Sequence, residues 1–527
     1  MTTTGLTIHG PGRTHPKPRV TGPPWAVVER RAPRWDAAAN TLFDVAILGG
    51  GINGACLYDR LVSRGHKVCL LDENDFAAGT SQASGMLIWG GLLYLRNLDV
   101  ATVLRLSAAR DAMIDGVSGV QAQPFRYVFS HRGGRGRWLV SSLLHVYWAM
   151  GRLRRSRPRH EREFSEAALL RGGAPRGAML YEEGRLDASD ARFVMQWMTP
   201  HADSGSVALN HGRLEGGGFD ARSDCWHLDV GDAFGTAGAT LRARTVVNCT
   251  GVWTDSVNAR FGIASPFRHA LSKGVYVGLE RDPEHVTPMI FEMGQHGDLL
   301  TWVPWGPVAM FGPTETVVHD VSAGFRVEPD DLRFLLDHAD RRLASGANAS
   351  SVVSLRCGVR PLAVPRAYTA AAYPLDLSRR SHVIEDEHVP WISTYGGKLT
   401  GCRLLAEKVA SRIERRRPAR HPPASVTHAP AEPVQWTRFG ELTEPVPSAA
   451  WCAEHENCST LDDYLRRRTN IAQWVPREGL GRDGEHLPAL LDITRRCFAR
   501  DDAHADELLA AYVRSVEQRF DAPLADL

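Results

Sequence analysis

A glycine-rich turn between two apolar segments is the clearest sign of chemistry in this sequence. Gly49, Gly51 and Gly54 form a GxGxxG pattern directly after the apolar run 43–48. In such a turn the first glycine permits the tight bend, the second lets the backbone approach a pyrophosphate, and the third lets helix and strand pack closely. The helix that follows offers its N-terminal N–H groups to the phosphates. The pattern therefore predicts a dinucleotide site.

An acidic residue stands where a ribose would need one. The helix-permissive segment 55–63 is followed by a second apolar strand that ends at Asp72, about twenty residues beyond the glycines. A carboxylate at this position suits the ribose hydroxyls of FAD or NAD and disfavours NADP. A second strand, 241–247, ends in a turn at Gly251. Such a return of the chain is typical of FAD proteins, in which the long cofactor touches several strand ends.

The composition is that of a globular protein that must position these turns on a large core. The 527 residues are 43% hydrophobic and 23% charged with a net charge of +2, which argues against a nucleic-acid partner. The nine cysteines form no CxxC pair, so no metal site is expected and a cytoplasmic location with reduced thiols is the simplest interpretation. No run reaches the length of a membrane span, and 138–150 is expected to be a packed or interfacial helix.

Six motifs in order along the chain resemble the FAD-dependent glycerol-3-phosphate dehydrogenase family, within the D-amino-acid-oxidase-type flavoproteins. They are GGGINGA, GTSQASGMLIWGGLLYL, NCTGVWTD, CGVRPL, YGGKLTGCRLLAE and TLDDYLRRRT. The resemblance covers nearly all of the chain after about Thr41. It identifies the sequence as a divergent member of that family, with FAD as cofactor.

The resemblance implies a fold that combines α/β and α+β parts: a Rossmann-type FAD-binding domain, an antiparallel-sheet substrate domain and a C-terminal helical domain. The Pro- and Gly-rich start of the chain predicts a flexible extension over 1–40. The expected segments are 41–121, 181–265 and 352–417 for the FAD domain, 122–180 and 266–351 for the substrate domain and a helical insert, 418–448 for a linker, and 449–527 for the helical domain.

The resemblance also implies a set of site residues. Positions that match contacts to the FAD phosphates, the ribityl chain and the flavin ring are Thr80, Ser81, Ser84, Gly396, Gly397, Lys398, Leu399 and Thr400. Lys398, Arg360 and Arg379 match cations around the substrate phosphate, where Arg offers a bidentate fork. The match of Arg379 is the least secure, because Arg380 is adjacent. Tyr94 is retained from the family, and Tyr276 stands where the family has a histidine.

Several polar positions of the family pocket are apolar here. The family's histidine is Trp89, its arginine is Leu93 and its lysine is Met86, while its GTTD reads as GPTE at 312–315. Each lost charge-assisted hydrogen bond to a phosphate is worth about 1.5–3 kcal/mol. An unperturbed phenol titrates near pH ~10, so Tyr276 is a poor substitute for a base. We therefore expect an intact flavin site and a remodelled substrate site.

Three functions remain open at this stage. The first is oxidation of sn-glycerol 3-phosphate to dihydroxyacetone phosphate by hydride transfer to flavin N5, with electrons passed to quinone or oxygen. The second is FAD-dependent oxidation of a less anionic alcohol or an amine, and the third is a non-catalytic flavoprotein. A homodimer and a peripheral contact with the inner face of the membrane are further hypotheses; the sequence leaves the acceptor, the catalytic base and the oligomeric state undetermined.

Overall fold

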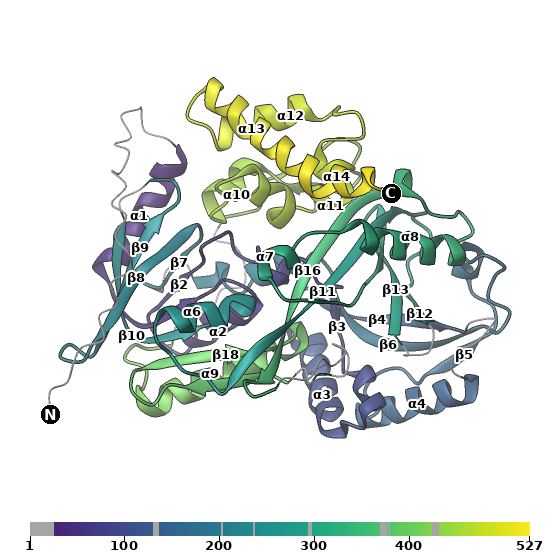
Figure 1. Ribbon diagram of the computed structural model, residues 1–527, viewed down its shortest axis with the longest axis horizontal. Helices are drawn as coiled ribbons and strands as arrows, with labels where there is room; N and C mark the ends of the chain where they lie inside the picture. The colour runs from purple at the N-terminus through teal and green to yellow at the C-terminus, as the bar shows by residue number, and fades with distance from the viewer. Residues whose placement is uncertain are drawn as a thin grey trace.

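Two β-sheets and a helical layer make up the protein (Figure 1). The computed structural model describes residues 26–129, 136–201, 204–235, 238–293, 298–368, 377, 380–423 and 432–527. The predicted fold class is confirmed: a nucleotide-binding sheet, a largely antiparallel second sheet and a C-terminal group of helices. In the described part of the chain, every helix is too short or too polar to cross a lipid bilayer.

The first sheet has a parallel centre in the order β18-β10-β1-β2-β7, and its strands are buried on both faces. The antiparallel strands β8, β9 and β17 complete it. Its strands are β1 (Leu42–Leu48), β2 (Val68–Leu71), β7 (Val207–Leu209), β8 (Gly212–Asp220), β9 (Cys225–Asp232), β10 (Ala239–Asn248), β17 (His382–Glu385) and β18 (Trp391–Tyr395). Parallel strands place their carboxyl ends along one edge, where ligands of such sheets bind.

Helices cover this sheet and connect its strands in the expected βαβ order. The helix α2 (Ile52–Val62) links β1 to β2, ends before Gly65 at φ +85°, and packs against α9 (Cys402–Arg416). Both helices bury one apolar stripe, as a sheet-covering helix must. The helices α1 (Ala26–Asn40) and α6 (Thr254–Arg260) pack on the opposite face of the sheet, and α5 (Asp190–Met195) packs against α2.

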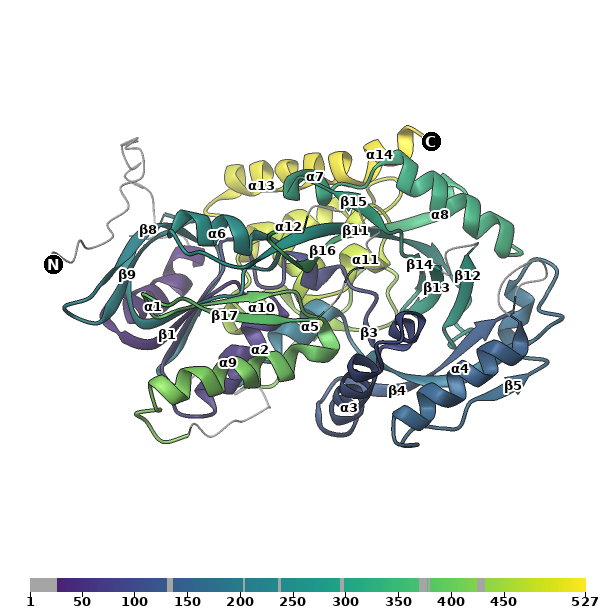
Figure 2. The ribbon, with the colours of Figure 1, turned by 60° about the horizontal axis from the view of Figure 1, so that its bottom comes forward.

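The second sheet runs in the order β15-β11-β14-β13-β12-β4-β6-β3, and all its described pairs are antiparallel except β12 with β4. Figure 2 shows α8 on one side of it and α3 with α4 on the opposite side. Its strands are β3 (Leu87–Ile88), β4 (Val120–Val128), β5 (Arg159–Glu161), β6 (Ala178–Leu186), β11 (Phe267–Glu280), β12 (Met289–Met293), β13 (Asp298–Trp305), β14 (Val308–Gly312), β15 (Thr316–Val318) and β16 (Val352–Pro365). Its helices are α3 (Val100–Gly116), α4 (Arg137–Met150), α7 (Val321–Gly324) and α8 (Pro329–Arg342).

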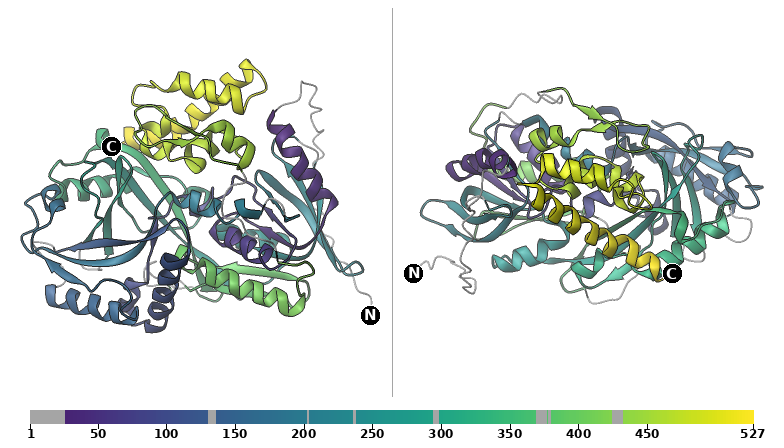
Figure 3. Two further views of the ribbon diagram at one scale, coloured as in Figure 1. Left: turned by 180° about the vertical axis from the view of Figure 1, so that it is seen from behind. Right: turned by 90° about the horizontal axis from the view of Figure 1, so that it is seen from above.

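The C-terminal helices lie across the junction of the two sheets, as the view from above shows (Figure 3). They are α10 (Ala449–His455), α11 (Ile471–Trp474), α12 (Leu487–Cys497), α13 (Asp502–Val516) and α14 (Ala522–Ala525), with the helical turn η9 (Asp463–Arg468) among them. The expected helical segment 449–527 has these helices along its whole length. Part of the expected linker is also ordered, because β19 (Trp436–Thr437) pairs with β20 (Val446–Pro447) and Phe439 between them is buried; residues 424–431 lie outside the described chain.

Two expected domain limits are wrong. Residues 26–40 are not a loose extension but the helix α1, which buries Val27, Arg31, Trp35 and Ala38 along one face. The buried Arg31 donates to Asp232 at 2.6 Å, and this polar residue in an otherwise apolar stripe hides the helix from a pattern search. Residues 1–25 lie outside the described chain. The strand β16 pairs along its length with β11, so 352–365 belongs to the second sheet and not to the FAD domain.

Candidate functional site

One large cavity lies at the carboxyl ends of β1, β2 and β10 and continues between β11, β13 and β16 of the second sheet. Its volume is about 1440 Å³, above the range of about 300–1,000 Å³ for a single small-molecule site. The expected site residues that line it are Gly49, Gly51, Asp72, Thr80, Ser81, Ser84, Tyr94, Gly251, Tyr276, Arg360, Gly396, Gly397, Lys398, Leu399 and Thr400. The cavity therefore has room for a dinucleotide and a second, smaller molecule.

The three glycines differ in backbone conformation and in the space around them, and the approach of Gly51 to a pyrophosphate remains a prediction. Gly49 has φ +101°, and a Cβ there would meet the Cys249 carbonyl oxygen at 2.6 Å. A Cβ on Gly54 would lie 1.9 Å from the Gly49 carbonyl oxygen, so this residue sets the close approach of helix and turn and lies behind the cavity wall. A Cβ on Gly51 would meet only Ser81 Oγ, at 3.2 Å, and would point toward the space that a pyrophosphate needs.

Asp72 lies at the end of β2, where the sequence predicts a ribose ligand. The Gly50 N–H donates to Asp72 Oδ2 at 2.6 Å, and the Asn74 N–H donates to Oδ1 at 2.9 Å. Burial raises the pKa of this carboxyl to about 7 against the opposite effect of the two hydrogen bonds. The carboxyl is thus held in place by the backbone before any ligand contacts it, and a contact to ribose remains a prediction.

The hydroxyl-bearing turn after β2 is held by its own hydrogen bonds. Ser81 Oγ accepts the Ile52 N–H at 3.0 Å at the start of α2, and Thr80 Oγ1 donates to the Val359 carbonyl at 2.5 Å. Ser84 Oγ accepts the Met86 N–H at 3.0 Å. Thr80 and Ser81 thereby fix the turn η1 (Thr80–Gln82) against β16 and the start of α2. Their direct contact with FAD phosphates stays a prediction.

Gly251 follows β10 and has φ +59°, which allows the sharp turn that the sequence predicts after Asn248. The Thr250 N–H donates to the Asn248 side-chain oxygen at 3.1 Å and closes the turn. The neighbouring Cys249 lies against Gly49, so the two strand ends meet at the cavity. This part of the wall therefore combines two segments that are far apart in the sequence.

The loop 396–400 is shaped by two glycines in left-handed conformations and by a histidine that the sequence analysis missed. Gly396 has φ +67° and Gly397 has φ +120°. The Gly396 N–H donates to His269 Nε2 at 3.1 Å, and Asn53 Nδ2 donates to the Gly396 carbonyl at 3.4 Å. Because Nε2 accepts a hydrogen bond, we assign the ring proton to Nδ1. Burial lowers the pKa of His269 to about 4, so the ring is neutral at pH 7.

His269 gives little signal in the sequence. It stands alone in the strand β11, and its partner Gly396 is more than a hundred residues away. Only the pairing of β11 with the neighbouring strands brings it beneath the loop. His269 therefore acts on the site through Gly396, as a positioning residue.

Lys398 and Tyr94 contact each other in the cavity lining. The Lys398 ammonium lies 4.6 Å from the centroid of the Tyr94 ring, a cation–π distance. Thr400 Oγ1 donates to the Trp89 carbonyl at 3.0 Å and ties the same loop to the segment 86–100. Trp89 and Leu93 line the cavity, which confirms that this apolar segment forms a pocket wall. Met86 is an exception, because it is buried in the core and outside the cavity lining.

Two cations of the substrate side, Arg360 and Lys273, are already paired with carboxylates. Arg360 Nη1 lies 3.0 Å from Glu315 Oε2 and 3.3 Å from Ser272 Oγ. The buried Lys273 ammonium lies 2.5 Å from Asp331 Oδ2. A phosphate would have to compete with these carboxylates. Arg379, the third expected cation, lies outside the described residues.

Tyr276 lies in the wall between Gly85 and Gly312 and is almost completely buried. Burial raises the pKa of its phenol above the ordinary value. A group with a raised pKa keeps its proton at neutral pH, so Tyr276 can donate a hydrogen bond there but is a poor general base.

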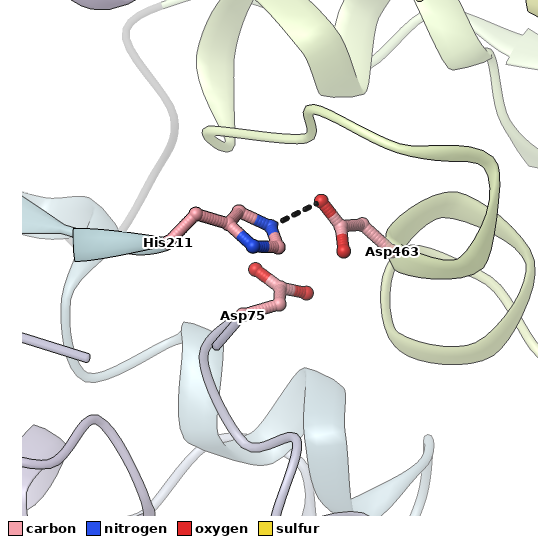
Figure 4. A group of neighbouring side chains, drawn as sticks. All are labelled: Asp75, His211 and Asp463. Carbon is pink, nitrogen blue, oxygen red and sulfur yellow. Dashed lines mark hydrogen bonds and ion pairs between the residues drawn. The ribbon is translucent and has the colours of Figure 1, made fainter. Parts of the chain in front are cut away.

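A second cluster of titratable side chains lies next to the nucleotide end of the cavity (Figure 4). Asp75, His211 and Asp463 come from the loop after β2, the β7–β8 turn and η9, and His211 Nε2 lies 3.0 Å from Asp463 Oδ2. This grouping could in principle bind a metal ion. However, Arg467 and Arg468 occupy the oxygens of Asp75 at 2.6–2.8 Å. The cluster is better explained as an ionic clamp that joins the C-terminal helices to the nucleotide-binding loop.

Comparisons with known proteins agree with this geometry. A family model described as FAD dependent oxidoreductase (DAO) matches residues 44–399. An aerobic glycerol-3-phosphate dehydrogenase of Staphylococcus aureus is 26% identical over 384 residues, which cover 72% of this chain and 68% of that protein. The glycerol-3-phosphate dehydrogenase of Bacillus halodurans complexed with FAD matches with a TM-score of 0.67 and 19% identity, over 94% of this chain and 99% of that one. An L-alpha-glycerophosphate oxidase of Mycoplasma pneumoniae with FAD bound matches with a TM-score of 0.53 and 14% identity, over 71% and 95% of the two chains.

Proposed function

Because this chain belongs to the FAD-dependent oxidoreductase family, we propose that it oxidises a small alcohol or amine, with sn-glycerol 3-phosphate as the first candidate substrate. The relatives support this candidate because two of them are named as glycerol-3-phosphate dehydrogenases. The observation that carries the proposal is the single cavity that joins the glycine turn to Lys398 and Arg360. Leu87, Trp89, Leu93 and Leu299 add apolar surface to the same lining.

The residues of the cavity fit FAD. Gly49 and Gly51 leave the backbone bare where a pyrophosphate would lie, and α2 directs its N-terminus at the same place. Asp72 stands at the ribose end, and the loop 396–400 lies at the opposite end of the dinucleotide-binding part. The glycine turn and Asp72 would thus hold the pyrophosphate and the ribose of the adenosine part of FAD, and the loop 396–400 would offer backbone N–H groups to the flavin.

The chemistry of the proposed reaction divides between cofactor and protein. Bound FAD supplies a hydride acceptor at flavin N5. The side chains of Lys398 and Arg360 attract and orient the substrate, and His269 holds the loop that carries Lys398. Trp89, Leu93 and Tyr276 exclude water from the reacting carbon. For glycerol 3-phosphate the product would be dihydroxyacetone phosphate.

A specific observation favours a second candidate, a less anionic alcohol or an amine. Glu315 pairs with Arg360, one of the three cations expected around a substrate phosphate, and Asp331 pairs with Lys273 in the same lining. Leu93 and Trp89 replace further polar groups of the family pattern with apolar surface. A substrate without a phosphate dianion would not have to displace either carboxylate.

Anaerobic titration of the flavin-loaded protein tests the proposed function. Addition of glycerol 3-phosphate should bleach the oxidised flavin absorbance if this is the substrate. A panel of neutral alcohols and primary amines should bleach it if the second candidate is right. A flavin that dithionite reduces but none of these compounds reduces would contradict both candidates and support a non-catalytic flavoprotein.

The electron acceptor is proposed to be quinone or oxygen, and a peripheral membrane contact would suit a quinone. The outer face of α4 supports such a contact, because Trp138, Leu139 and Val146 are 78%, 52% and 51% exposed. Arg137 begins the helix, and its guanidinium carbon lies 5.3 Å from the centroid of the Trp138 ring. Basic side chains beside exposed apolar ones suit an anionic lipid surface. Cosedimentation with anionic vesicles should fall when Trp138 is replaced by serine.

A further inference from the structure

A pair of stacked aromatic rings joins the two halves of the fold beside the cavity. Trp253 follows the turn at Gly251, and Phe325 follows α7; their ring centroids lie 5.6 Å apart and their planes are inclined by 8°. Stacking of this kind stabilises a contact beyond the apolar area that it buries. Trp253 lines the cavity, whereas Phe325 is outside the described lining and supports the indole ring. We call this pair the aromatic clasp.

Trp253 lies next to the two segments that are expected to bind the pyrophosphate of FAD. A Cβ on Gly79 would lie 3.1 Å from Trp253 Cζ3, so the indole ring packs on the residue just before Thr80. Thr250, three residues before the tryptophan, lies against the glycine turn, because a Cβ on Gly49 would meet the Thr250 Cα at 2.9 Å. A pyrophosphate between the glycine turn and Thr80 would therefore have the indole ring beside it.

The two rings are carried by different parts of the fold. Trp253 directly precedes α6, which packs against β10 and β18 of the first sheet. Phe325 is held over the second sheet through its neighbour Gly324. A Cβ on Gly324 would lie 2.8 Å from a Val359 methyl group, and the Cys357 thiol donates to the Gly324 carbonyl at 3.4 Å. The helices α6 and α7 lie close together in both Figure 1 and Figure 2, so the clasp spans the junction of the two sheets.

We infer that the aromatic clasp is a gate for the cofactor: the stacked rings retain FAD in the cavity, and their separation lets it enter and leave. Phe325 acts on FAD through Trp253, because its own ring is outside the described lining. Loss of the Phe325 ring therefore makes opening more frequent in the empty and in the loaded protein alike. The rates of FAD binding and release then rise by the same factor, and the Kd, which is the ratio of release to binding, stays constant. The inference rests on FAD as the cofactor and is independent of the substrate.

The test measures FAD exchange, which does not depend on turnover. Stopped-flow mixing of the full-length apoprotein with FAD gives the binding rate from the change in flavin fluorescence, and dilution of the loaded protein gives the release rate. Phe325→Ala removes the ring, and Phe325→Tyr is the matched variant that keeps it. The control is Phe334→Ala, because Phe334 on α8 lines the same cavity and is 38% exposed, as Trp253 is.

Phe325→Ala should raise both rates by about three- to tenfold and change the Kd by less than about twofold, whereas Phe325→Tyr and Phe334→Ala should change neither rate by more than about twofold. Unchanged rates in Phe325→Ala would overturn the inference. A faster release with an unchanged binding rate would also overturn it, because Phe325 would then contribute to the affinity for FAD and not to a gate. Phe325→Leu, which keeps apolar bulk without a ring, serves as a second variant if Phe325→Ala does not fold, and the same outcomes apply to it. Failure of the proposed function is separate: the flavin would then remain oxidised with every substrate, whatever the rates of FAD exchange.

Discussion

Replacement of Asp75 by asparagine should lower the free energy of unfolding by about 3–5 kcal/mol, the cost of leaving a buried charge without its partner. The Asp75 side chain is completely buried in the clamp of Figure 4. It accepts hydrogen bonds from Arg467 Nε at 2.6 Å and from Arg468 at 2.7 and 2.8 Å. Asparagine preserves the size of the side chain and removes its charge.

The loss should fall mainly on Arg468. Arg467 keeps the carboxylates of Asp462 and Asp463 at 2.8 and 2.9 Å. For Arg468, the remaining hydrogen bond in the described chain goes to the Glu456 carbonyl at 3.0 Å, which carries no full charge. The variant therefore buries the Arg468 guanidinium against an amide and a carbonyl. The loss of stability lies in the upper part of the range of about 3–5 kcal/mol if no water reaches this guanidinium.

Urea unfolding followed by tryptophan fluorescence measures this loss. The control is Asp337→Asn, which breaks an exposed ion pair with Arg341 between side chains that are 58% and 66% exposed. Exposed pairs of this spacing are worth about 0.3–0.5 kcal/mol, so the control should be nearly neutral. A loss of less than about 1 kcal/mol for Asp75→Asn, similar to the control, would refute the explanation of the clamp as a major contribution to stability.

The pH dependence gives a second check on the same residue. Burial opposes ionisation of Asp75, but Arg468 and Arg467 outweigh it and hold its pKa below the ordinary value. A lowered pKa contributes stability that is present above the unfolded value of about 3.9 and is lost as the pH falls through the folded value. The stability difference between the wild-type protein and Asp75→Asn should therefore be constant near neutral pH and shrink below about pH 4.

Three further predictions concern the cofactor site. Gly51→Ala should fold but lose FAD, whereas Gly54→Ala should fold poorly because its Cβ would lie 1.9 Å from a carbonyl oxygen. Thermal unfolding and flavin content distinguish the two variants. Equal flavin retention in both would contradict the functions assigned to Gly51 and Gly54. The FAD affinity of the apoprotein should rise roughly tenfold from pH 6 to pH 8, since the Asp72 carboxyl with its pKa of about 7 must ionise to accept ribose hydroxyls. In fluorescence titrations, Asp72→Asn should abolish this dependence of the FAD affinity on pH. His269→Leu leaves the Gly396 N–H without its acceptor and should weaken FAD binding by about 1–3 kcal/mol; an unchanged Kd would show that the loop holds its shape without the ring.

In the apoprotein, Asp72 and Asp75 change the free energy of unfolding with pH in opposite directions. Its folded pKa of about 7 lies above the unfolded value, so between about pH 4 and pH 7 the folded chain binds the extra proton. Stability from this residue is thus largest at the acidic end of the window and is lost as the pH rises through 7. This trend is opposite to that of Asp75, and the variants Asp72→Asn and Asp75→Asn separate the two contributions.

The amino-acid sequence by itself determined the parts of the protein that depend on neighbours in the chain. Local backbone geometry specifies the GxGxxG turn, the strand that ends at Asp72 and the turn at Gly251. A glycine with positive φ and a run of apolar residues each specify the conformation of the segment in which they stand. The loop 396–400 follows from a family motif, and its two glycines both have positive φ.

Only the tertiary structure decided which charges and rings meet. Glu315 and Arg360, His269 and Gly396, and Asp75 and Arg468 are each separated by 45 residues or more, and strand pairing or domain docking brings them together. A cation in the sequence looks available for a phosphate until its carboxylate partner is located. The electrostatic character of the substrate pocket is therefore a property of the fold, since it depends on distances of a few ångströms between distant segments.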